Sequence, residues 1–152
     1  INVGKDGKVI ITAGTDDGIF YGLRTLLQYR ISAASNKLPG CIIKDRPDVA
    51  ERTVHLDCGR KYFSRVWIQN FIRKMSWQKY NAIEIHFSED QGLRLYSKKF
   101  PWLAGSYNGD NRYLTQKDMA AICATARKYH VEVIPSFDTP GHTEYMLKRY
   151  KN

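Results

Sequence analysis

Three stretches of the chain each end a short apolar run with side chains that can do chemistry. One run passes into a polar loop that carries Asp138 and His142. A second ends in the adjacent acids Glu89 and Asp90, and a third begins at Arg52. Such runs are typical of buried parallel strands, and in parallel α/β folds the functional residues lie at the carboxyl ends of the strands. We therefore expect these side chains to share one site.

The loop of Asp138 and His142 favours proton chemistry. The two residues lie four positions apart across a Pro-Gly turn, which can fold them toward each other. A histidine beside a carboxylate has a tuned proton affinity, which suits a catalytic site. The alternative is that His142 caps the helix that follows it.

The acids Glu89 and Asp90 must divide their roles, because adjacent residues of an extended segment face opposite ways. One acid can enter the site while the other binds backbone or an arginine. His86, three residues earlier, is more typical of a core histidine than of a ligand. A metal site built from His86, Glu89 and His142 has no compact ligand spacing, so we expect no metal and no other cofactor.

Two arginines, Arg52 and Arg60, flank the apolar run at residues 53–56, and Asp57 follows the carboxyl end of that run. An arginine at the mouth of a strand can hold two hydroxyls of a sugar, or a carboxylate, with its planar fork. The alternative for either arginine is a structural ion pair with Asp57 or Glu89. The aromatic side chains that could stack on the face of a sugar are Trp67, Trp102 and Tyr107.

The composition is that of a folded globular protein. Of the 152 residues, 43% are hydrophobic and 12% aromatic, which is enough for a sizeable core.

The net charge is +9, but the basic residues are spread along the chain without a recognisable nucleic-acid module, so no nucleic-acid partner is expected. The three cysteines are odd in number and lack metal-ligand spacing, which indicates free thiols. No apolar run is long enough to cross a bilayer.

Strands and helices alternate in the second part of the chain. Helices are expected after the N-cap candidate Ser64, after a capping box that begins at Thr115, and from Thr143 onward. A long loop precedes Thr115. The three strands are expected at residues 53–56, 82–87 and 131–134. Alternation of this length predicts a parallel sheet.

The first fifty residues have the pattern of the tail of a small α/β domain. A strand is expected at residues 9–12, a helix from near Gly18, and a further strand at residues 41–44. Alternating charges and a proline at residues 45–48 indicate a linker. We therefore divide the chain into residues 1–48 and residues 49–152.

From about residue 10 to its end, the chain resembles the family 20 glycoside hydrolases, the β-N-acetylhexosaminidases and lacto-N-biosidases. The segment Phe20–Gln28 is similar to the closing helix of the small α/β domain that precedes the barrel in that family. The segments Arg52–Phe63, Asn81–Gly92 and Phe137–His142 are similar to its first three barrel strands. The resemblance implies an α/β fold, namely a partial (β/α)8 TIM barrel of three β/α units preceded by the tail of a small α/β domain.

The resemblance also implies an activity, the hydrolysis of terminal β-linked N-acetylhexosaminides with retention of configuration. In that family the 2-acetamido oxygen of the substrate attacks the anomeric carbon and gives an oxazolinium-type intermediate. An aspartate positions the acetamido group, and an adjacent glutamate acts as general acid and then as base. The substrates would be glycans that end in GlcNAc or GalNAc, and the family favours a secreted or cell-surface location.

By motif position, Arg52 would hold the ring hydroxyls of the sugar, and Glu89 and Asp90 would bind substrate at the wall of the site. Asp138 and His142 would support the acid residue. The family usually has two aspartates where this chain has a glutamate and an aspartate, which extends one carboxylate by a methylene. Its catalytic Asp-Glu pair belongs to the fourth strand, in a Gly-Gly-Asp-Glu-like run that this sequence does not contain. We therefore interpret the chain as a fragment that is inactive alone.

Three alternatives stay open. The variant motif at residues 87–92 hints at a lacto-N-biosidase that releases a disaccharide. A non-catalytic carbohydrate-binding module would keep the sugar pocket without the acid pair, and a basic surface protein would depend on its charge. An open sheet of apolar strands would also expose hydrophobic surface, so we expect self-association or contact with the remainder of a barrel.

Overall fold

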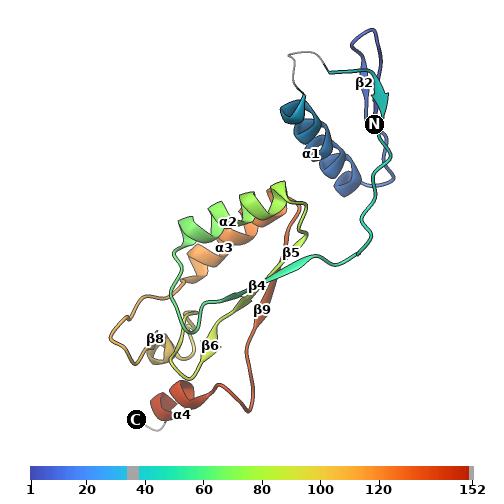
Figure 1. Cartoon of the computed structure of the whole chain (residues 1–152). Coiled ribbons are helices and arrows are strands. Elements are labelled where there is room, and N and C mark those ends of the chain that lie inside the picture. The colour runs from blue at the N-terminus through green and yellow to red at the C-terminus, as the bar shows by residue number, and fades with distance from the viewer. Residues whose placement is uncertain (34–37, 151–152) are drawn as a thin grey trace. The chain divides into compact units, whose positions relative to one another are not determined.

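The computed structural model describes residues 1–33 and 38–150 of the chain. The chain forms two compact units, Ile1–Ala50 and Glu51–Asn152 (Figure 1). Within the described ranges, no helix combines the length and the apolar character needed to cross a membrane.

The first unit combines a small antiparallel sheet with one helix. Its strands are β1 (Asn2–Val3), β2 (Val9–Ile10) and β3 (Cys41–Ile42), in the order β2-β1-β3. The helix α1 (Asp16–Ser32) begins after Thr15, whose hydroxyl accepts a hydrogen bond from the Gly18 amide at 3.1 Å. The two expected strands are present but shorter than predicted, and β1 is an addition that the sequence pattern does not predict.

The second unit is built on a parallel sheet of three strands, which confirms the prediction from strand–helix alternation. Its strands are β4 (Thr53–Asp57), β5 (Ala82–His86) and β9 (Glu132–Ser136), in the order β4-β5-β9. The residues Asp57, His86 and Ser136 lie opposite one another at the carboxyl end of the three strands. The loops that leave this end therefore start at one edge of the sheet.

Two helices, α2 (Arg65–Trp77) and α3 (Gln116–Lys128), pack against each other beside this sheet (Figure 1). The predicted N-cap Ser64 accepts a backbone hydrogen bond at 3.3 Å. The predicted capping box is complete, because the Thr115 hydroxyl accepts from the Asp118 amide at 3.1 Å and the Asp118 carboxylate accepts from the Thr115 amide at 3.0 Å. Local hydrogen bonds thus set where both helices begin.

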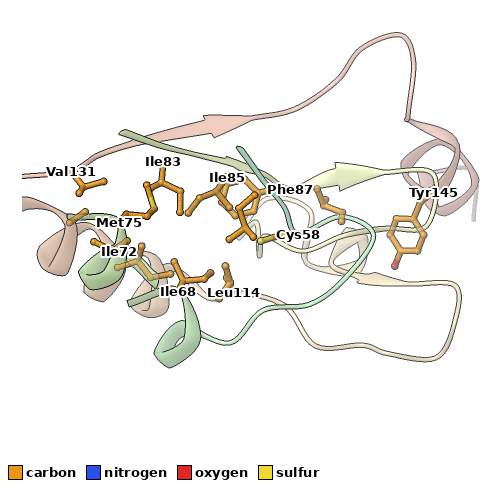
Figure 2. Packing of buried hydrophobic residues seen from close by; sticks show 14 residues of the cluster. Cys58, Ile68, Ile72, Met75, Ile83, Ile85, Phe87, Leu114, Val131 and Tyr145 are labelled. Carbon is orange, nitrogen blue, oxygen red and sulfur yellow. The ribbon is translucent and has the colours of Figure 1, made fainter. Parts of the chain in front are cut away.

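The core of this unit lies between β5 and the helices. Figure 2 shows Ile83 and Ile85 of β5 beside the α2 side chains Ile68 and Ile72. All four are fully shielded from solvent. Alternate residues share one face of a strand and residues four apart share one face of a helix, so the two periods bring the isoleucines together. Burial of each such side chain contributes roughly 1.5–3 kcal/mol.

The opposite face of the sheet is polar. By strand register it carries His55, Glu84, His86 and Ser136, and His55 Nδ1 lies 3.3 Å from Glu84 Oε1. The expectation that an open sheet exposes its aliphatic side chains is therefore wrong for β5, whose isoleucines are buried against the helices. Of the aliphatic strand residues, Ile134 shares the polar face, because it lies opposite Glu84.

Between β5 and α3 the chain forms a second, antiparallel sheet where the sequence pattern predicts a long loop. Its strands are β6 (Ser88–Glu89), β7 (Gly92–Leu93) and β8 (Gly105–Ser106), in the order β6-β7-β8. A short 3₁₀-helix, η1 (Pro101–Leu103), precedes β8. The last helix, α4 (Glu144–Tyr150), packs against β7 and η1. The strand β6, which carries Glu89, is thus part of this small antiparallel sheet.

A buried arginine, Arg94, stabilises the segment between β5 and α3. Its side chain is 1% exposed, and its Nη1 donates to the carbonyls of Asp110 and of Arg112, the latter at 2.9 Å. Its Nη2 lies 3.6 Å from the Asp110 carboxylate. Hydrogen bonds from Arg112, and the nearby positive charges, lower the pKa of the Asp110 carboxyl to about 2. A guanidinium away from water needs such partners, because an unpaired buried charge is costly.

Candidate active site

A buried glutamate, Glu89, is the centre of the polar groups at the carboxyl end of the parallel sheet. It belongs to β6, which closely follows β5, and it is 3% exposed. Arg60 Nη2 lies 2.8 Å from Oε1, and His142 Nδ1 lies 2.8 Å from Oε2. His86 Nε2 lies 3.6 Å from Oε1. Three nitrogen-bearing side chains thus surround a carboxylate that would be costly to bury alone.

The turn after β4 brings Arg60 to Glu89. Gly59 approaches the acid so closely that a Cβ at this position would lie 2.8 Å from Glu89 Cβ. Asp57, the last residue of β4, accepts from the Arg60 amide at 3.0 Å and from its Nη1 at 2.8 Å. The guanidinium therefore bridges the acid at the end of β4 and the buried acid of β6. Its side chain is 55% exposed, so a ligand in solvent can reach it.

Arg52 lies at the other end of the sheet, so the expectation that it joins the acidic pair is wrong. Its amide donates to Asn81 Oδ1 at 2.7 Å, and its Nε donates to the Lys79 carbonyl at 2.7 Å. Both partners precede β5 and mark the amino end of the strands. Arg52 precedes β4 whereas Arg60 follows it, and five residues of strand span roughly 16 Å. The sequence analysis considers both arginines and gives the sugar hydroxyls to Arg52, although the place of Arg60 after the strand is the signal that identifies it.

The loop after β9 brings Asp138 and His142 to the same site. His142 Nε2 lies 4.0 Å from Asp138 Oδ2, and that oxygen lies 3.9 Å from His86 Nε2. The Asp138 amide donates to the Ser88 hydroxyl at 3.1 Å, which ties the loop to β6. The side chains of Asp138 and His142 are 47% and 44% exposed. The structure therefore brings three of the predicted residues together, with the buried Glu89 behind two solvent-accessible groups.

Asp90 takes a backbone partner, whereas Glu89 enters the site. Asp90 Oδ1 accepts a hydrogen bond at 3.1 Å from the amide of Glu144, the first residue of α4. Its Oδ2 lies 3.9 Å from His142 Nδ1. This division matches the expectation that one acid of the pair binds backbone. The substrate-binding role of Asp90 stays a prediction.

Behind the site, polar side chains continue along the sheet. His86 is 3% exposed, as expected of a core histidine, and its Nδ1 lies 3.1 Å from Ser136 Oγ. A hydrogen bond from Ser136 lowers the pKa of the Glu84 carboxyl, and the nearby His55 acts in the same direction. These contacts hold His86 in place, and its second ring nitrogen faces Glu89 and Asp138.

Cys58 is not a reactive thiol, and we assign no metal to the site. Burial raises the pKa of the Cys58 thiol to about 12, so this cysteine is protonated at neutral pH and is a poor nucleophile. Glu89, Asp90 and His142 each offer one ligand atom within 4.8 Å of the others. Those acids already face the Arg60 guanidinium and the backbone of α4. We therefore assign the three side chains to ion pairs and hydrogen bonds.

The sequences of both units match models of one protein family. A sequence model of the catalytic domain of glycosyl hydrolase family 20 matches residues 50–152. A model of domain 2 of the same family matches residues 1–46. The chain therefore belongs to glycosyl hydrolase family 20.

Relatives that align with nearly the whole chain are named β-hexosaminidases. The β-hexosaminidase subunit beta of Mus musculus is 31% identical, over 97% of this chain and 28% of its own length. The β-hexosaminidase of Porphyromonas gingivalis is 33% identical, over 93% of this chain and 20% of its own length. The chain thus spans less than a third of these curated relatives.

Solved structures of the family share the fold. The β-N-acetylhexosaminidase from Bacteroides fragilis gives a TM-score of 0.88 at 28% identity, over 99% of this chain and 32% of that chain. The family 20 β-N-acetylhexosaminidase from Streptomyces coelicolor gives a TM-score of 0.74 at 32% identity, over 86% of this chain and 29% of that chain. The arrangement of strands and helices is therefore one that occurs in family 20 enzymes.

Proposed function

We propose that the chain is the part of a β-N-acetylhexosaminidase that begins the catalytic barrel and builds one side of its sugar site. The strands β4, β5 and β9 with the helices α2, α3 and α4 are the first three units of a (β/α)8 barrel, within residues 49–152. Residues 1–48 are the tail and linker of a small α/β domain. Membership of family 20 and the similarity to solved hexosaminidases support this assignment.

The observation that carries the proposal is the buried Glu89 at the carboxyl end of three parallel strands. In β/α barrels the active site lies at that end. Arg60 and His142 reach Glu89 from the loops after the two neighbouring strands. A buried acid that pairs with half-exposed side chains fixes their direction while leaving them open to a ligand. We infer that the ligand is a terminal N-acetylhexosamine.

Arg60 takes the role that motif position suggests for Arg52. The planar guanidinium suits two adjacent hydroxyls, which it can contact with parallel N–H groups. Asp57 and Glu89 hold the Arg60 side chain at the rim of the site. Arg52 instead donates to backbone at the amino end of the sheet. Arg60 therefore holds the ring hydroxyls of the sugar.

Asp138 and His142 support the acid chemistry of the retaining, substrate-assisted reaction. That reaction needs an aspartate for the acetamido group and a glutamate for proton transfer. The sequence contains no Asp-Glu run, and we propose that another part of the barrel supplies these two groups. His142, held by Glu89, can donate a hydrogen bond to the incoming glutamate. The Asp138 carboxylate disfavours loss of a proton from that glutamate, because like charges repel.

Binding of N-acetylglucosamine to the chain tests the proposal. Half of a sugar site should bind weakly, with a Kd on the order of 1 mM, as measured by saturation-transfer NMR. Arg60→Ala should abolish the signal. Arg65→Ala is the matched control, because Arg65 is also half-exposed and pairs with an acid, Asp118, on the helices. Absence of binding, or binding that survives Arg60→Ala, would contradict the proposed function.

A further inference from the structure

The adjacent acids Glu89 and Asp90 hold His142 in two different ways. Glu89 contacts the imidazole directly, with 2.8 Å between Oε2 and Nδ1. Asp90 contacts the backbone two residues further on, where its Oδ1 accepts a hydrogen bond from the Glu144 amide at 3.1 Å. The segment after β9 is therefore attached at two points. The His142 side chain contacts Glu89 of β6, and the Glu144 amide contacts Asp90, the residue after β6.

The backbone of His142 requires such attachment. Its φ is 56°, in the left-handed region that residues with a Cβ rarely adopt. A strained conformation of this kind persists when the surrounding structure over-determines it. On one side, the Thr143 hydroxyl donates to the Pro140 carbonyl at 2.9 Å, across the residue. On the other side, Asp90 fixes the start of α4.

We propose that Asp90 is a positioning residue, which orients His142 through the Glu144 amide and does not bind the sugar. Its Oδ1 is engaged by the backbone, and its Oδ2 faces the imidazole at 3.9 Å. A sugar hydroxyl at Asp90 would have to compete with these contacts. The role in catalysis rests on the proposed function, because His142 matters to the reaction through that function. The attachment itself does not depend on the proposed function.

The acceptor side of the contact is tested with Asp90→Ala and Asp90→Asn. In Asp90→Ala, hydrogen exchange at the Glu144 amide should be about tenfold faster, as expected for loss of one local hydrogen bond. The nuclear Overhauser contact between the His142 ring and the Glu89 side chain should weaken with it. Asp90→Asn keeps an acceptor oxygen and should restore both signals.

The donor side is tested at the other partner, in case Asp90→Ala unfolds. Glu144→Pro removes the N–H group at the first position of a helix, where proline is tolerated. Glu144→Ala is the matched control, because it keeps the N–H group and removes the same carboxylate. We expect Glu144→Pro to weaken the contact between the His142 ring and Glu89, and Glu144→Ala to leave it as in the parent chain.

Three results would overturn the inference. They are an unchanged His142–Glu89 contact in Asp90→Ala, the same contact retained in Glu144→Pro, and a failure of Asp90→Asn to restore it. The last result would show that the charge of Asp90 acts and that its hydrogen bond does not. None of these measurements uses a sugar, so they can fail or succeed independently of N-acetylglucosamine binding.

Discussion

Glu89 of β6 contacts two loops through its two carboxylate oxygens. Arg60 reaches it from the loop after β4, and His142 reaches it from the loop after β9. Without the carboxylate, Arg60 and His142 would each lose a contact of 2.8 Å. The site therefore depends on this acid for its shape as well as for its charge.

Glu89→Ala should lower the free energy of unfolding by about 1–3 kcal/mol, because it removes polar contacts between charged groups, one partner of which is buried. Urea unfolding followed by circular dichroism measures the change. Glu132→Ala, at an exposed acid that begins β9, serves as the control and should stay within about 0.5 kcal/mol of the parent chain. Equal effects of the two substitutions would show that Glu89 does not organise the loops.

Three site residues could be predicted because each follows an apolar run, and the carboxyl ends of parallel strands share one edge. That argument leads to Glu89, Asp138 and His142. The same argument, applied strictly, selects Arg60, because Arg52 stands before its strand. Arg94 could not be predicted, since a buried arginine has the same sequence signature as one on the surface.

The connection between β5 and α3 is held by charged side chains around Asp110. Hydrogen bonds from Arg112 and the charge of Arg94 lower the pKa of the Asp110 carboxyl from 3.8 to about 2. A group whose pKa is lower in the folded state stabilises that state in its charged form. The contribution of Asp110 is therefore present above about pH 4 and is lost as the pH falls toward 2.

Asp110→Asn should remove this part of the pH dependence. The difference in unfolding free energy between the parent chain and the variant should be largest above about pH 4 and should shrink as the pH approaches 2. Urea unfolding at a series of pH values between these limits measures it. A difference that stays constant over the series would show that the Asp110 carboxylate is not held by Arg112 and Arg94.

The helix starts at Ser64 and Thr115 were predictable because a capping hydrogen bond joins residues three positions apart. The small sheet of β6, β7 and β8 was not predictable. Its strands have two residues each, and a periodic pattern needs a longer segment to show. The same reason explains why β1, also of two residues, was missed.

At the scale of the whole molecule, the parallel sheet has two edges in the part of the chain that the structure describes. There β4 and β9 each pair with β5 alone, and an unpaired strand edge can accept another strand. The polar face that carries His55 and Glu84 lowers the hydrophobic cost of an open sheet. Self-association, or pairing with the remainder of a barrel, stays a prediction that now rests on the strand edges.

The chain alone should not hydrolyse a chromogenic N-acetylglucosaminide. It contains no Asp-Glu pair, and proton transfer by a positioned side chain typically contributes roughly 10²–10⁴-fold to the rate. The release of nitrophenol from the substrate measures turnover. Hydrolysis well above the protein-free rate, unchanged in His142→Ala, would show that other residues of this chain carry the acid chemistry.

The place where the sugar binds can be observed directly by NMR of the backbone amides. N-acetylglucosamine added to the isotope-labelled chain should shift the amides of residues 58–60, 88–90, 138, 139, 141 and 142, at and around Glu89 at the carboxyl end of the sheet. Glucose, which lacks the acetamido group, controls for unspecific sugar contacts. Shifts confined to the amino end of the sheet, around Arg52 and Asn81, would contradict a sugar site at Glu89.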